Sequence, residues 1–135
     1  MREDLTHHGI QETRTSAQVD DALLNSGDAT VLMVVNSVCG CAAGKARPGV
    51  VYSLQGNGAK PTKTVTVFAG ADTDAVDRVR ELSPGIPPSS PAIYLFQNGK
   101  PVYVLPRHGI ENRQAPEIAF MLQQAFAEHC KPVEV

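Results

Sequence analysis

The chain has 135 residues and a formal net charge of −2, with 42% hydrophobic and 19% charged residues. These values fit one globular domain over residues 1–135 and exclude a disordered tail. The longest aliphatic run, residues 31–35, is far shorter than the ~20 residues of a membrane-spanning helix. The small negative charge also argues against nucleic acid or an anionic membrane surface as a partner.

The hydrophobic patterns predict strands and helices in alternation. In chain order, the expected elements are a strand at residues 10–13, a helix from 15 to about 27, a strand at 30–36, a helix at about 42–54, a strand at 64–68, a helix at 72–82, strands at 92–97 and 100–105, and a helix from 116. Strand–helix–strand units favour parallel pairing, whereas a hairpin adds antiparallel strands. We therefore expect an α/β fold with a mixed four- or five-stranded sheet and helices on both faces.

Three local signals refine these elements. Pro48 stands inside the second expected helix and predicts a kink or a late start there. Asn98 and Gly99 form the two-residue loop of a primed hairpin turn. Pro101 cannot donate a hydrogen bond to a sheet, so the strand at residues 100–105 belongs at an edge.

The cysteines are the most informative residues of the sequence. Two of the three stand in the motif Cys39-Gly40-Cys41, and the third is Cys130. An odd count in a chain of this size does not indicate a disulfide scaffold. The first residues lack the basic start and apolar middle of a signal peptide, so we expect a cytoplasmic location. In a reducing compartment, a close cysteine pair is typical of a redox or metal site.

The position of the motif favours redox chemistry. Cys39 and Cys41 come where a strand is expected to turn into a helix, and free N–H groups at a helix N-terminus stabilise a thiolate. Lys45 and Arg47 would add to this effect. Cys39 comes first and is expected to be more exposed, so it is the preferred nucleophile, with Cys41 as the alternative. A disulfide between residues two apart closes a small, strained ring that suits transient exchange.

Other residues offer support or alternatives. Cys130 could be a resolving thiol, or could complete a metal site with Cys39 and Cys41, and inert buried cysteines are a further possibility. Pro91 stands directly before a strand and could be cis, placed beside the thiols. His108 follows the last strand and could tune a thiol, although an exposed loop histidine is the commoner case.

The segment VVNSVCGCAAGKARP, residues 34–48, resembles the active-site segment of the bacilliredoxins, proteins of thioredoxin fold that carry a CGC motif. Shorter matches to the family's pattern lie at residues 64–70, 88–91, 106–108 and 127–130. The resemblance covers about residues 1–130. It implies a thioredoxin-like fold, in agreement with the expected order of elements.

The resemblance also implies a function, the removal of bacillithiol from cytoplasmic proteins that are modified on cysteine. In that scheme Cys39 takes the bacillithiol onto itself, and Cys41 or a second thiol releases it, with Gly40 and Pro91 supporting the site. The partners are then S-thiolated client proteins and a low-molecular-weight thiol, without a cofactor. The fold further implies that the peptide before Pro91 is cis and lies against the CGC turn. Proteins of this family have also been viewed as disulfide isomerases.

Overall fold

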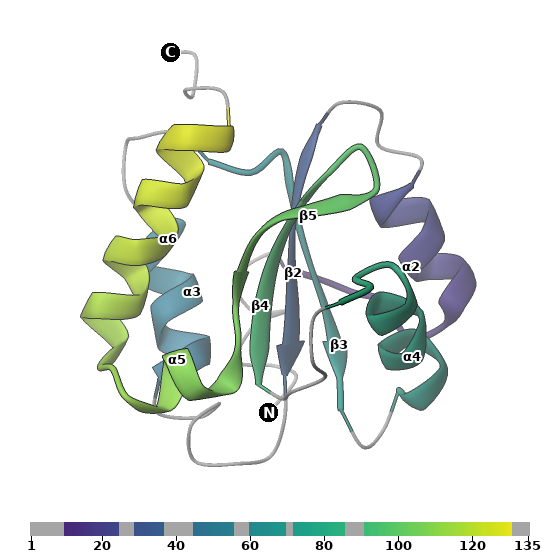
Figure 1. Ribbon diagram of the computed structural model, residues 1–135, viewed down its shortest axis with the longest axis horizontal. Coiled ribbons are helices and arrows are strands. Elements are labelled where there is room, and N and C mark those ends of the chain that lie inside the picture. Colours follow the sequence, from purple (N-terminus) through teal and green to yellow (C-terminus); the bar gives the residue numbers. More distant parts are fainter. Residues whose placement is uncertain are drawn as a thin grey trace.

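A five-stranded mixed sheet forms the centre of the protein, as the computed structural model shows for residues 10–24, 29–36, 45–55, 60–69, 72–85 and 91–130 (Figure 1). The strand order is β1-β3-β2-β4-β5. The strands are β1 (Gln11–Glu12), β2 (Thr30–Asn36), β3 (Lys63–Phe68), β4 (Ala92–Gln97) and β5 (Lys100–Leu105). Strands β1, β3 and β2 run parallel, and β4 runs antiparallel to both of its neighbours, β2 and β5. The expected mixed sheet is confirmed.

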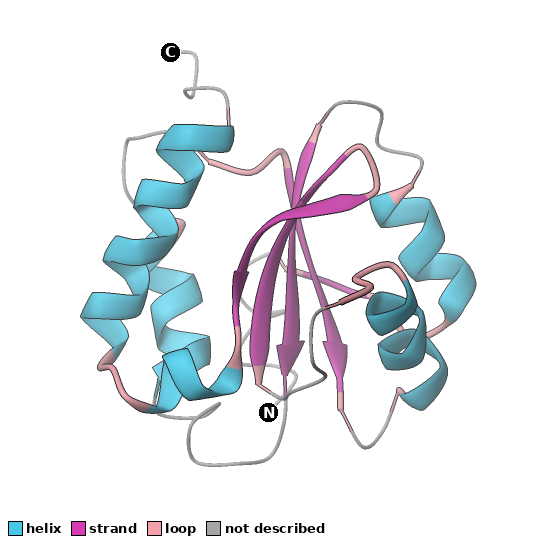
Figure 2. Cartoon of the chain, viewed as in Figure 1, coloured by secondary structure: helices cyan, strands magenta, loops and turns pink. Residues whose placement is uncertain are grey.

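Helices cover both faces of this sheet, which is also confirmed (Figure 2). On one face α2 (Ser16–Leu23) packs against α4 (Thr73–Glu81). On the other face α3 (Arg47–Ser53) packs against α6 (Ala115–His129). The short helix α5 (Arg107–Glu111) joins the end of β5 to α6. None of the helices in these described ranges is long and apolar enough to cross a membrane.

Strand β2 contributes side chains to both hydrophobic cores, because it lies at the centre of the sheet and all its residues are buried. Side chains alternate between the two faces of a strand. Leu32 and Val34 therefore join the core beneath α3 and α6, whereas Val31, Met33 and Val35 join the core beneath α2 and α4. The aliphatic run at residues 31–35 is typical of a strand that is buried on both faces of a sheet, in agreement with this arrangement.

The local signals are also confirmed. The regular part of α3 begins at Arg47 with Pro48 in its first turn, which is the predicted late start. Asn98 and Gly99 have φ angles of 56° and 76°, as a primed hairpin turn requires. Strand β5, which contains Pro101, lies at an edge of the sheet.

Helix α5 was not predicted from the sequence. We expected His108 in a loop, and this was wrong, because it lies in helix α5. A helix this short spans little more than one turn and shows no repeating apolar stripe, so its pattern cannot be distinguished from a loop.

Candidate active site

Cys39, Gly40 and Cys41 lie outside the described residues, but the chain on both sides of them is described. Asn36, the last residue of β2, is 1% exposed. After the motif, the described chain resumes at Lys45, and Ala46 and Arg47 are both buried. The motif therefore belongs to the connection between β2 and α3, the strand-to-helix connection that the sequence predicted.

Four strands meet at the end of the sheet where β2 finishes, which we call the CGC end. Asn36 is paired with Phe68, the last residue of β3, and Val35 is paired with Ala92, the first residue of β4. Strand β5 also finishes at this end, because Leu105 is paired with Ile93. Residues that follow β3 and β5 or precede β4 are thereby brought to the same side of the molecule as the CGC segment.

Pro91 and His108 both lie at the CGC end. Pro91 is buried directly before β4. His108 is exposed on α5, which follows β5 (Figure 1). Ser90 lies outside the described residues, so the cis geometry of the peptide before Pro91 stays a prediction.

Helices α2, α3, α4 and α6 all begin at this end and run away from it, as Figure 1 shows. Their N-termini place partial positive charge there, which favours anions. Asp74 gives a direct example. Its carboxylate accepts a hydrogen bond from the backbone N–H of Ser16 at the start of α2 (3.0 Å), and this bond lowers the pKa of Asp74.

Two cationic side chains follow the CGC segment in the chain. Lys45 donates a hydrogen bond through Nζ to the backbone carbonyl of Glu111, the last residue of α5. Arg47 is only 4% exposed. The ammonium of Lys45 is thus directed toward α5.

Cys130 lies at the opposite end of β2. It ends α6, is 8% exposed, and its thiol is hydrogen-bonded to Thr30, the first residue of β2. Burial raises the pKa of this thiol. A strand of seven residues spans about 20 Å at the usual rise per residue. The structure therefore brings Pro91 and His108 to the CGC end, but it does not bring Cys130 there.

The length of α6 is a sequence signal that could have indicated this position of Cys130. The helix has 15 residues, which at about 1.5 Å per residue makes it as long as β2. A helix that begins at the CGC end and follows the sheet must therefore finish at the other end. The apolar pattern predicted this helix but not the end of the sheet that Cys130 reaches.

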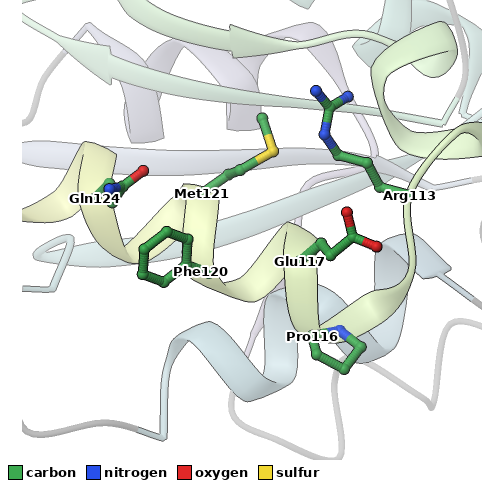
Figure 3. A pocket seen from close by; sticks show the side chains of 6 residues that line it. All are labelled: Arg113, Pro116, Glu117, Phe120, Met121 and Gln124. Carbon is green, nitrogen blue, oxygen red and sulfur yellow. The ribbon is translucent and has the colours of Figure 1, made fainter.

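A shallow depression of about 540 Å³ lies on the outer side of α6 (Figure 3). It is lined by Arg113, Pro116, Glu117, Phe120, Met121 and Gln124. Phe120 is 60% exposed at this surface. Of the described residues predicted for the site, Pro91, His108 and Cys130 do not line the depression.

Comparison with known proteins identifies relatives over almost the full chain. The family model described as "Disulphide isomerase" matches residues 1–130. A protein named Bacilliredoxin from Salinibacter ruber is 49% identical over 130 residues, which are 96% of this chain and 76% of that protein. Another Bacilliredoxin, from Koribacter versatilis, is 48% identical over 130 residues, covering 96% of this chain and 88% of its own.

Solved structures with a similar fold include thioredoxins. A mutant thioredoxin from Halobacterium salinarum has a TM-score of 0.63 at 14% identity and covers 92% of this chain and 93% of its own. Fasciola hepatica thioredoxin has a TM-score of 0.62 at 12% identity and covers 89% and 99%. At such low identity the likeness concerns the fold alone, and the expected thioredoxin-like fold is confirmed.

Proposed function

The chain belongs to the bacilliredoxin family and is a thiol–disulfide oxidoreductase, and from this premise we propose that it removes bacillithiol, or a similar small thiol, from mixed disulfides on cytoplasmic proteins. The observation that carries the proposal is the CGC motif in the connection between β2 and α3. This connection leads from the end of β2 into α3, and the N-terminus of a helix stabilises a thiolate.

The first step is a thiol–disulfide exchange. The Cys39 thiolate attacks the bacillithiol sulfur of the mixed disulfide. The disulfide bond to the client breaks, the client cysteine leaves as a thiolate that takes a proton, and a new disulfide joins Cys39 to bacillithiol. The client cysteine is thereby reduced, and Cys39 is oxidised to a mixed disulfide with bacillithiol.

Release of bacillithiol needs a second thiol. We propose that the Cys41 thiolate attacks the Cys39 sulfur, which expels bacillithiol as a thiolate and leaves a disulfide between Cys39 and Cys41. The strain of this small ring makes the disulfide easy to reduce by an external thiol, which completes the cycle. Cys130 is a poor candidate for this step, because it is buried against Thr30 at the other end of β2.

The position of Cys130 also bears on the alternative of a metal site. Cysteine sulfurs that share a zinc ion each lie about 2.3 Å from it. Cys130 adjoins the first residue of β2, whereas the segment with Cys39 and Cys41 continues from Asn36, the last. This separation favours exchange chemistry over a metal site that uses all three cysteines.

Incubation with a bacillithiolated client peptide tests the proposal. We expect mass spectrometry to detect the free peptide together with a Cys39–Cys41 disulfide in the wild type, and a bacillithiol adduct on Cys39 in the Cys41→Ser variant. The Cys130→Ala variant serves as the control and should behave like the wild type. An unchanged peptide after incubation with fully reduced wild-type protein would exclude this substrate.

Disulfide isomerisation is the second candidate function, favoured by the description of the matching family model. In that reaction the Cys39 thiolate attacks a disulfide within one client and forms a mixed disulfide with it, and the released client thiolate attacks another of the client's own disulfides. A further client thiolate then attacks the mixed disulfide, which restores the Cys39 thiolate and leaves a rearranged disulfide in the client. Recovery of activity by a client enzyme with scrambled disulfides measures it. A faster recovery with the wild type than with Cys39→Ser supports isomerisation, and equal rates exclude it.

A further inference from the structure

The C-terminal end of α5 is closed by side chains. The carbonyl of His108 accepts a hydrogen bond from the Asn112 amide (2.8 Å), and that of Gly109 accepts one from the Arg113 guanidinium (2.9 Å). The carbonyl of Ile110 accepts the backbone N–H of Arg113 (3.1 Å). The last carbonyls of a helix lack partners within the helix itself, so such bonds stabilise its end.

The remaining carbonyl of this last turn, that of Glu111, accepts its hydrogen bond from Lys45. Asn112 and Arg113 follow α5 directly in the chain, whereas Lys45 lies 66 residues away. Lys45 is also the described residue that follows the CGC segment. This bond therefore connects the active-site segment to α5.

The surroundings of Lys45 make the connection well defined. The next residue, Ala46, is 1% exposed and belongs to the hydrophobic core. The acceptor lies at the negative end of a helix, where an ammonium group is favoured. The backbone of Lys45 is thus anchored by the core on one side, and its side chain is anchored by α5 on the other.

We propose that Lys45 is a positioning residue for thiol exchange, which holds the downstream end of the CGC segment in place through its hydrogen bond to Glu111. The inference rests on the proposed function and extends it, because it assigns this lysine a mechanical role in place of the stabilisation of a thiolate by its charge. Exchange requires the attacking sulfur to approach along the axis of the disulfide bond. A segment held at both ends loses less freedom in reaching that geometry.

Lys45→Met removes the donor and retains much of the side-chain length, and Lys45→Arg restores a cationic donor. Two further variants are matched controls. Asn112→Ala removes another bond at the end of α5 without touching the CGC segment. Lys100→Met removes an exposed lysine at the far end of β5.

The test uses a synthetic peptide whose cysteine side chain is joined by a disulfide bond to the amino acid cysteine. The test therefore does not depend on bacillithiol. The rate of single-turnover attack is measured against pH. We expect Lys45→Met to lower the plateau rate at high pH about tenfold, while the pH midpoint is unchanged. Lys45→Arg, Asn112→Ala and Lys100→Met should stay within about threefold of the wild type.

Hydrogen–deuterium exchange supplies a second measurement that does not require activity. In Lys45→Met, exchange should become faster in peptides that cover residues 37–44 and 107–112, and stay unchanged in α2 and α4. If Lys45→Met had the plateau rate of the wild type and unchanged hydrogen–deuterium exchange, the proposal would be overturned. A shifted pH midpoint with an unchanged plateau rate in Lys45→Met would also overturn it, because Lys45 would then act through its charge. An equal fall of the plateau rate in Asn112→Ala would overturn it as well.

The outcomes also separate this proposal from the proposed function. A wild type that attacks the cysteine adduct but not a bacillithiol adduct contradicts the substrate and leaves the role of Lys45 supported. A wild type that attacks neither adduct contradicts the proposed function. The hydrogen–deuterium exchange of Lys45→Met then decides whether Lys45 holds the CGC segment.

Discussion

The thiol of Cys130 is hydrogen-bonded to Thr30, the first residue of β2, whereas the CGC segment continues from Asn36, the last residue of the same strand. The two ends of one central strand therefore lead to different cysteines of the chain. One is a buried thiol with a raised pKa. The others follow the end of the sheet where helix N-termini gather.

Cys130 should react slowly in the native protein. Burial raises the pKa of its thiol, and the thiolate is the species that iodoacetamide alkylates. At pH 8 we expect native Cys130 to be modified much more slowly than in the chain unfolded in urea, as followed by mass spectrometry of its peptide. Equal rates in the two states would contradict the burial of this thiol.

The same raised pKa predicts the direction of a pH effect on stability. Below about pH 8.5 the thiol is neutral in both the folded and the unfolded state and has no effect. Above it, the unfolded chain loses the proton more readily, so the free energy of unfolding falls as the pH rises. Urea unfolding between pH 8 and pH 10 should show a smaller fall for Cys130→Ala than for the wild type, and an equal fall would contradict this prediction.

The two cysteines of the motif should differ when each is replaced. Cys39→Ser should abolish attack on a mixed disulfide, because the hydroxyl group is not a nucleophile toward disulfide sulfur. Cys41→Ser should accept the small thiol on Cys39 and hold it as a trapped adduct. Mass spectrometry of each variant after one turnover distinguishes the two results.

Two other outcomes are informative. A Cys39→Ser variant that still accepts the small thiol at the normal rate would show that Cys41 is the nucleophile. Unimpaired turnover by Cys41→Ser would show that an external thiol releases the adduct, and Cys39 would stay the nucleophile of a monothiol mechanism.

Gly49 allows the close approach of α3 to α6. A methyl group at this position would lie 2.6 Å from Cγ2 of Ile118 and 3.4 Å from the carbonyl oxygen of Ala115. We expect Gly49→Ala to lower the free energy of unfolding by about 1–3 kcal/mol, the usual cost of overpacking. Chemical denaturation measures it, with the exposed Gln124→Ala in α6 as the control. An unchanged or higher stability of Gly49→Ala would mean that the two helices separate freely.

Asp72 closes the turn that follows β3 at the CGC end. Its carboxylate accepts the backbone N–H of Phe68 (3.0 Å), and its own N–H donates to the Phe68 carbonyl (2.8 Å). Asp72→Ala leaves the buried N–H of Phe68 without this acceptor and should lower the free energy of unfolding by about 1–3 kcal/mol. Asp72→Asn retains an acceptor oxygen and should lose less. Equal losses in denaturation experiments would show that the charge matters rather than the hydrogen bond.

The sequence by itself determined the order of the main elements and revealed the CGC motif that we propose carries the chemistry. The buried strand at residues 30–36, the hairpin turn at Asn98 and Gly99, and the late start of α3 at Pro48 all depend on local properties. Apolar periodicity, positive φ angles and the missing proline N–H are expressed within a few residues of the chain. The CGC motif was likewise visible because its residues are adjacent.

Only the tertiary structure decided which of the distant residues meet. The hydrogen bond from Lys45 to Glu111 joins two segments that no local pattern relates. The position of Cys130 beside Thr30 depends on the direction in which α6 crosses the sheet. Periodicity reports which face of an element is buried, but the crossing of helices over the sheet determines which end each residue reaches. The sequence therefore identified the candidate thiols, and the fold determined which described residues lie at the same end of the sheet as the CGC segment.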